Sequence, residues 1–139
     1  LKKIDKRFNT AFKQPINNLE KVLIAEVPAK YSPIFEMIQL ASIKGFKARN
    51  VEGPRRLIIF SDMLPNTQEF SMFKGVPDYK SFSSTAYGER SKTNLSGVKV
   101  EIHYLMKYPR LQTMKLNNFW EKYFEDTGAR LTQVGTIEG

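Results

Sequence analysis

"RRLIIFSDMLPNT", residues 55–67, decides the fold of this 139-residue chain. Four apolar residues in a row, 57–60, lie between two arginines and a Ser-Asp pair. A short apolar run bounded by turn residues is typical of a strand that is covered on both faces, as in a parallel sheet. We therefore expect a strand over 55–61 that leads directly into Asp62.

The remaining elements follow from the spacing of apolar residues and from turn signals. Helices are predicted over 4–23 with a kink at Pro15, from Pro33 to Gly45 with Ser32 as the N-cap, and over 111–127 before Gly128. Strands are predicted over 98–106 and 129–137, and segment 63–97 reads as a long loop with a weak helical stretch around 85–95. Alternating strands and helices predict one α/β domain over 1–139, with a Rossmann-like, mostly parallel sheet flanked by helices.

The composition narrows the kinds of site that the chain can carry. The absence of cysteine excludes disulfides and thiolate metal sites and fits a reducing compartment such as the cytoplasm. His103 is the single histidine, too few for a zinc site or a catalytic triad, so we expect it to be structural. No apolar run approaches the ~20 residues of a membrane span.

The formal net charge of +8 favours acidic partners, nucleic acid among them. An alternative is an ordinary excess of surface lysine, because the charges do not form one continuous run. The candidate anion-binding patch consists of five basic residues: Lys44, Lys47, Arg49, Arg55 and Arg56.

Asp62 and Ser32 are the candidate metal ligands. Ligands of open α/β sheets bind outside the carboxyl ends of the strands, near a switch point in strand order, and Asp62 follows the carboxyl end of the 55–61 strand. A carboxylate there suits Mg²⁺ or Ca²⁺, which bind oxygen ligands. Two structural alternatives stay open. Asp62 can close an Asx turn, and the Ser32 hydroxyl can cap the following helix.

Three segments resemble the von Willebrand factor type A-like (vWA-like) family, in a bacterial branch: "KYSPIFEMIQLAS" (30–42), "RRLIIFSDMLPNTQEFSMF" (55–73) and "LNNFWEKYFEDTGARL" (116–131). The resemblance extends from about residue 1 to residue 137. It implies a doubly wound sheet and a divalent-cation site at its carboxyl edge. That site combines an Asp-x-Ser-x-Ser motif, a later Thr or Ser, and an Asp after the fourth strand. Ser32 matches the second element and Asp62 the third.

The chain departs from the family pattern in one respect, since Asp-x-Ser-x-Ser does not occur in it. We therefore expect the C-terminal part of a longer vWA-like domain, lacking the first strands. One edge of the 55–61 strand would then be unpaired and open to dimerisation or strand swapping.

The function that this resemblance implies is a non-enzymatic protein-interaction module with an incomplete cation site. An acidic side chain of a protein partner would complete the coordination of Mg²⁺ or Ca²⁺. The residues expected to contact that partner are Ser61, Met63 and Asn66.

Two other functions remain as alternatives. One is a basic nucleic-acid-binding domain that uses the patch defined above. The other is a metal-dependent phosphoesterase-like enzyme, which needs Asp62 and at least one further acid from among Glu36, Glu69 and Asp78. No phosphate-binding loop, dinucleotide-binding or nucleophile-elbow motif is present in the sequence.

Overall fold

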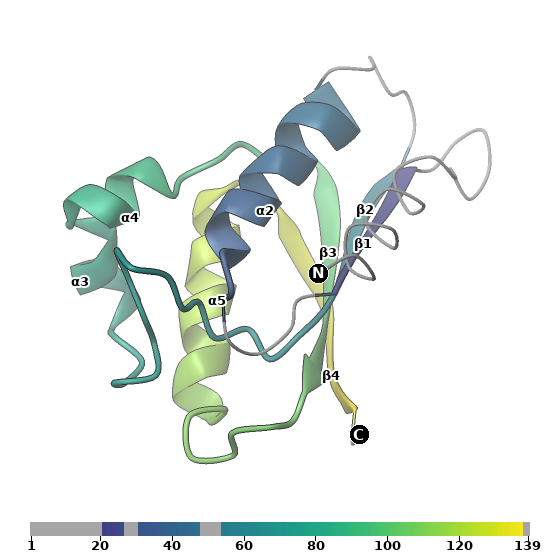
Figure 1. Cartoon of the computed structure of the whole chain (residues 1–139). Helices are drawn as coiled ribbons and strands as arrows, with labels where there is room; N and C mark the ends of the chain where they lie inside the picture. Colours follow the sequence, from purple (N-terminus) through teal and green to yellow (C-terminus); the bar gives the residue numbers. More distant parts are fainter. Residues whose placement is uncertain (1–20, 27–30, 48–53, 138–139) are drawn as a thin grey trace.

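The computed structural model describes residues 21–26, 31–47 and 54–137 (Figure 1). Its strands are β1 (Lys21–Glu26), β2 (Arg55–Ser61), β3 (Val98–Leu105) and β4 (Arg130–Ile137). Its helices are α2 (Ile34–Leu40), which continues as the π-helix η1 (Ala41–Lys47), α3 (Tyr79–Ser83), α4 (Ala86–Arg90) and α5 (Met114–Asp126). All described strand pairs are parallel, so the predicted α/β fold with a parallel sheet flanked by helices is confirmed.

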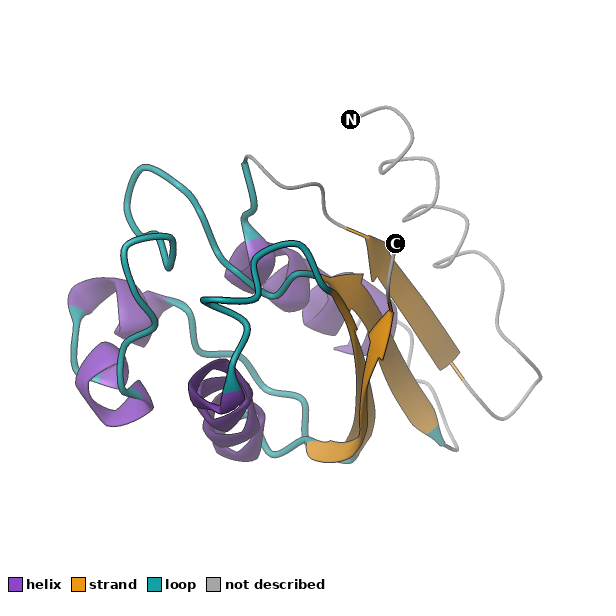
Figure 2. Cartoon of the chain, turned by 90° about the horizontal axis from the view of Figure 1, so that it is seen from below, coloured by secondary structure: helices purple, strands orange, loops and turns teal. Residues whose placement is uncertain are grey.

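The described strands lie in the order β1-β2-β3-β4. Each crossover therefore moves to the next strand in the same direction, and crossovers of one hand then place their helices on one face of the sheet. Figure 2 shows α2, α3, α4 and α5 on that single face. Within the described strands the order never reverses, so the predicted switch point beside β2 is not found there.

Two predictions about the beginning of the chain are corrected. Residues 21–23, expected at the end of a helix, belong to strand β1, whereas residues 1–20 lie outside the described part of the chain. A short apolar run such as 22–25 is compatible with either element, and pairing decides between them. β1 pairs with β2 from Lys21–Arg55 to Glu26–Phe60, so the β2 edge expected to be unpaired is occupied.

Most other predicted elements agree with the structure. β2 has the predicted bounds, β3 and β4 differ from the predicted strands by one residue, and α5 begins at Met114 after the cap residue Thr113. The weak helical stretch corresponds to α4, which begins where the Thr85 hydroxyl oxygen accepts a hydrogen bond from the Gly88 N–H at 3.0 Å. The short helix α3 was not predicted.

The core lies between the sheet and the helices, and Phe35 of α2 is at its centre. Its ring stacks on Phe82 of α3 at 5.1 Å and lies 5.0 Å from the ring of Trp120 and 5.1 Å from that of Tyr123, both in α5. Because aromatic rings bury large areas and pack in specific orientations, this cluster fixes α2, α3 and α5 against one another. Trp120 of the cluster also donates a hydrogen bond to the Met63 carbonyl, two residues after the end of β2.

β2 was expected to be buried on both faces, but its burial alternates along the strand. Leu57 and Ile59 are buried, whereas Ile58 and Phe60 are only half-buried. On the second face Phe60 stacks on His103 of β3, with ring centroids 4.8 Å apart. This contact gives the single histidine a packing role.

Candidate functional site

The chain leaves β2 through two side-chain-closed turns. The Ser61 hydroxyl oxygen accepts a hydrogen bond from the Met63 N–H at 2.9 Å, and Asp62 Oδ1 accepts one from the Leu64 N–H at 2.9 Å. Asp62 therefore closes the Asx-type turn that the sequence left as an alternative. Only one of its two carboxylate oxygens is used in this way.

Met63 has the left-handed backbone angle φ of 58°, which is unfavourable for a residue with a side chain. Its carbonyl accepts a hydrogen bond from Trp120 Nε1 at 2.9 Å, and its own side chain is fully buried. The surrounding structure thus holds a strained residue immediately after Asp62. Strain of this kind is concentrated at functional sites, although it identifies none by itself.

In the part of the chain that the structure describes, two buried side-chain polar atoms have no hydrogen-bond partner. They are Asp62 Oδ2 and Ser32 Oγ, which belong to the two residues predicted as cation ligands. Asp62 is 1% exposed and Ser32 is 0% exposed. A buried polar group without a partner costs about 1–3 kcal/mol, and a charged group costs more. Such atoms call for a ligand, an ion or a bound water.

Backbone pairing brings the loops of these two residues together. The Ser32 N–H donates to the Asn66 carbonyl at 3.0 Å, and the Asn66 N–H donates to the Ser32 carbonyl at 3.1 Å. Asn66 is four residues after Asp62, so the Ser-Pro turn before α2 is joined to the segment that leaves β2. The expectation that Ser32 caps α2 is wrong. The helix starts after Pro33 with no side-chain cap, and the Ser32 hydroxyl has no partner among the described residues.

Burial raises the pKa of the Asp62 carboxyl above its ordinary range. The Leu64 N–H and the positive charge of Lys107 act in the opposite direction, but the effect of burial exceeds both. The carboxylate is therefore incompletely stabilised by the described residues. A divalent cation would favour its charged form, as any close positive charge does.

The available donors fit part of a coordination shell of Mg²⁺ or Ca²⁺. These ions take oxygen ligands, and Mg²⁺ commonly uses one or two carboxylates and keeps several waters. Asp62 Oδ2 and Ser32 Oγ supply one carboxylate oxygen and one hydroxyl oxygen. The described residues contain no group of three or more His, Cys, Asp or Glu side chains suited to a metal, so an all-protein cage is not formed by them.

The three residues predicted to contact a partner differ in their exposure. Ser61 and Met63 are fully buried, and their polar groups bond within the turn and to Trp120. Both residues therefore belong to the buried turn around Asp62. Asn66 is half-buried and is the one residue of this set that reaches the surface.

The described residues of the predicted anion-binding patch differ in exposure and in partners. Lys44 is exposed on η1, whereas Arg55 donates a hydrogen bond to the Ser96 carbonyl at 3.0 Å and Arg56 pairs with Glu101 at 2.7 Å. The Lys47 side chain and Arg49 lie outside the described residues. Because Arg55 and Arg56 begin β2, they lie at the opposite end of this strand from Asp62.

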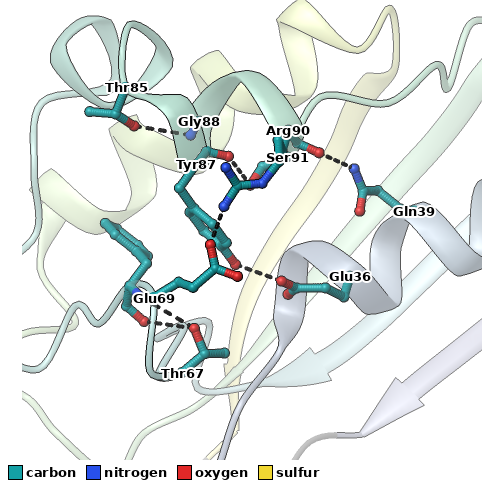
Figure 3. Close-up of polar contacts among 10 residues, drawn as sticks. Glu36, Gln39, Thr67, Glu69, Thr85, Tyr87, Gly88, Arg90 and Ser91 are labelled. Atoms are coloured by element: carbon teal, nitrogen blue, oxygen red, sulfur yellow. Dashed lines mark hydrogen bonds and ion pairs between the residues drawn. The ribbon is translucent and has the colours of Figure 1, made fainter.

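Two of the three carboxylates considered for an enzyme have other partners (Figure 3). Glu36 accepts a hydrogen bond from the Tyr87 hydroxyl at 2.9 Å, and Glu69 pairs with Arg90. Asp78 is exposed at the start of α3. Glu36 and Glu69 thus belong to a group of paired side chains, which we name the α2–α4 polar cluster: Glu36, Gln39, Glu69, Tyr87 and Arg90.

Gln112 was not identified from the sequence. It precedes α5, and its side-chain amide bonds to the backbone of the β2 and β3 exits. A glutamine in a turn after a strand carries no distinctive sequence signal, because its function depends on which carbonyls the fold places beside it.

No family model matches the chain, and neither a curated protein nor a solved structure matches it. Among the described residues, no helix is long and apolar enough to cross a membrane.

Proposed function

We propose that this chain is part of a non-enzymatic protein-interaction module of the vWA type, which uses Asp62 and Ser32 to bind a divalent cation. One observation carries the proposal. The two side chains selected by their match to the family motif are the two that bury an oxygen atom without a partner among the described residues. Chance coincidence is disfavoured, because buried polar atoms are hydrogen-bonded in the great majority of cases.

The cation would supply positive charge at Asp62 and an electrophilic position for an oxygen ligand from outside the chain. Asp62 Oδ2 and Ser32 Oγ would contact it directly, while the backbone pair between Ser32 and Asn66 keeps the two loops together. The chain contains no Asp-x-Ser-x-Ser motif, so water has to fill much of the shell. We therefore expect weak binding by this chain, and an acidic side chain of a protein partner as the external ligand.

The experiment must detect weak binding at identified residues. Titration of the ¹⁵N-labelled chain with Mn²⁺, followed by NMR, does this because the paramagnetic ion broadens nearby amide signals. We expect selective broadening at Ser32, Asp62 and Met63, and competition by Mg²⁺ or Ca²⁺. Asp62→Asn, which keeps the Oδ1 acceptor but removes the charge, should abolish the effect.

Asp78→Asn is the matched control, because it removes an exposed carboxylate from the start of α3 and should leave the broadening at Asp62 unchanged. Equal broadening in the wild-type chain and in Asp62→Asn would contradict the proposal. So would broadening centred on exposed acids such as Asp78.

A further inference from the structure

The β2–β3 ladder ends one residue before Asp62. Its last register pair is Ser61–Tyr104, and the Asp62 and Leu105 carbonyls follow it. Gln112 Nε2 donates to both carbonyls, at 3.1 Å to Asp62 and 2.8 Å to Leu105. One side-chain amide thus joins the two backbones where their direct pairing stops.

The oxygen of the same amide holds the loop that follows β3. Gln112 Oε1 accepts hydrogen bonds from the Lys107 N–H at 2.9 Å and from the Tyr108 N–H at 2.7 Å. The backbone N–H of Gln112 in turn donates to the Tyr108 carbonyl at 3.0 Å. Both donors and both acceptor sites of the amide are therefore in use, which is the full capacity of a glutamine side chain.

We infer that Gln112 is a positioning residue for Asp62, acting as an additional rung of the β2–β3 ladder that sets where the Asp62 backbone lies. Trp120 holds the next residue through a hydrogen bond to the Met63 carbonyl. The backbone at Asp62 and Met63 is consequently held by two side chains, one before α5 and one within it. The role in cation binding rests on the proposed function, whereas the role in holding the backbone does not.

Gln112→Met tests this inference, because methionine matches the length of glutamine but makes none of these four hydrogen bonds. The first readout is hydrogen exchange at the Leu64 amide and the Trp120 indole, both of which bond within the β2 exit. We expect at least tenfold faster exchange at these two groups. The second readout is the Mn²⁺ affinity at Asp62, expected to fall about tenfold, as for other residues that orient metal ligands.

Gln39→Met is the matched control. Gln39 Nε2 also donates to two backbone carbonyls, those of Arg90 and Lys92, but in the α2–α4 region. It should leave both readouts at Asp62 unchanged. If Gln39→Met alters them as much as Gln112→Met does, the effect is general loosening and the inference is overturned.

Gln112→Glu keeps an acceptor for the Lys107 and Tyr108 N–H groups but loses the donors to the two carbonyls, so it covers the case in which Gln112→Met does not fold. Faster exchange at Leu64 and Trp120 in a folded Gln112→Glu supports the inference, and wild-type exchange overturns it. If the wild-type chain shows no Mn²⁺ broadening, the proposed function fails, and the exchange data alone decide the role of Gln112.

Discussion

The α2–α4 polar cluster and the β2 exit, residues 61–64 with Ser32, treat polar side chains in opposite ways. In the cluster each named side chain has a polar partner: Glu36 with Tyr87, Glu69 with Arg90, and Gln39 with the Arg90 carbonyl (Figure 3). Gln39 also bonds to the Lys92 carbonyl. In the β2 exit two buried side-chain oxygens have no hydrogen-bond partner among the described residues. The number of polar contacts therefore does not indicate a binding site. Buried polar atoms that lack a partner do indicate one.

The energies of the two regions differ in the same sense. The Arg90 and Glu69 side chains are 58% and 61% exposed, and an exposed ion pair contributes only about 0–1 kcal/mol. The β2 exit combines an incompletely paired carboxylate with the left-handed Met63. Each such feature costs about 1–3 kcal/mol, so the fold there tolerates a cost that the cluster does not carry.

Trp120→Ala should cause the largest change in the free energy of unfolding. The side chain is fully buried, and its indole N–H supports the Met63 carbonyl. Truncation leaves a large cavity beneath the β2 exit and is expected to destabilise the protein by about 3–5 kcal/mol. Urea unfolding measures this loss. A loss below about 1 kcal/mol would contradict the packing described for the exit.

Asp62→Asn should stabilise the cation-free protein, in contrast to most substitutions at buried positions. The amide retains an acceptor for the Leu64 N–H and removes the cost of the buried charge. We expect a gain of roughly 1 kcal/mol in the free energy of unfolding at neutral pH in the presence of a chelator, because an unpaired buried charge costs more than an unpaired neutral group. Glu69→Gln in the cluster is the control, and it should give no gain.

The pH dependence of stability should differ between the wild-type chain and Asp62→Asn. Since the pKa of Asp62 is raised on folding, the folded state holds the proton more tightly than the unfolded state does. This contribution favours folding at low pH, is lost as pH rises from about 4 through the raised pKa, and is constant above it. Stability of the wild-type chain minus that of Asp62→Asn, measured by urea unfolding with chelator, should fall with pH. A difference that rises with pH would contradict the burial effect.

Tyr87→Phe tests the paired region and should have the smallest effect. It removes the hydroxyl that donates to Glu36 but keeps the ring, which stacks on Phe70 at 5.4 Å. The expected loss is about 0.5 kcal/mol, the lower end of the net contribution of one hydrogen bond, because this hydrogen bond is exposed. Chemical denaturation measures it, and Mn²⁺ broadening at Asp62 should be unchanged. A loss of broadening would show that the two regions are coupled.

Local patterns predicted the elements that carry the site. The apolar run before Ser61 identified β2 with its bounds, and helical spacing of aromatic residues identified α5. Asp62 could be singled out because parallel strands present their carboxyl ends at one edge. These predictions needed only the near neighbours of each residue.

The rest depended on contacts between residues far apart in the sequence. Ser32 was expected to cap α2, but its backbone pairs with Asn66 and its hydroxyl has no described partner. Gln112 bonds to the Asp62 carbonyl 50 residues away. The predicted helix includes residues 21–23 of β1, because an apolar run fits both elements until β2 pairs with it. No local pattern encodes these contacts.

The most direct test of the central claim is the Mg²⁺ dependence of stability in the wild-type chain and in Asp62→Asn. A cation that binds only the folded state adds RT ln(1 + [Mg²⁺]/Kd) to the free energy of unfolding. Urea unfolding with chelator, and then with Mg²⁺ at matched ionic strength, measures this term. We predict that Asp62→Asn is the more stable protein with chelator and that only the wild-type chain gains stability from Mg²⁺. An equal gain in both proteins, or no gain in either, would contradict the assignment of a cation to Asp62 and Ser32.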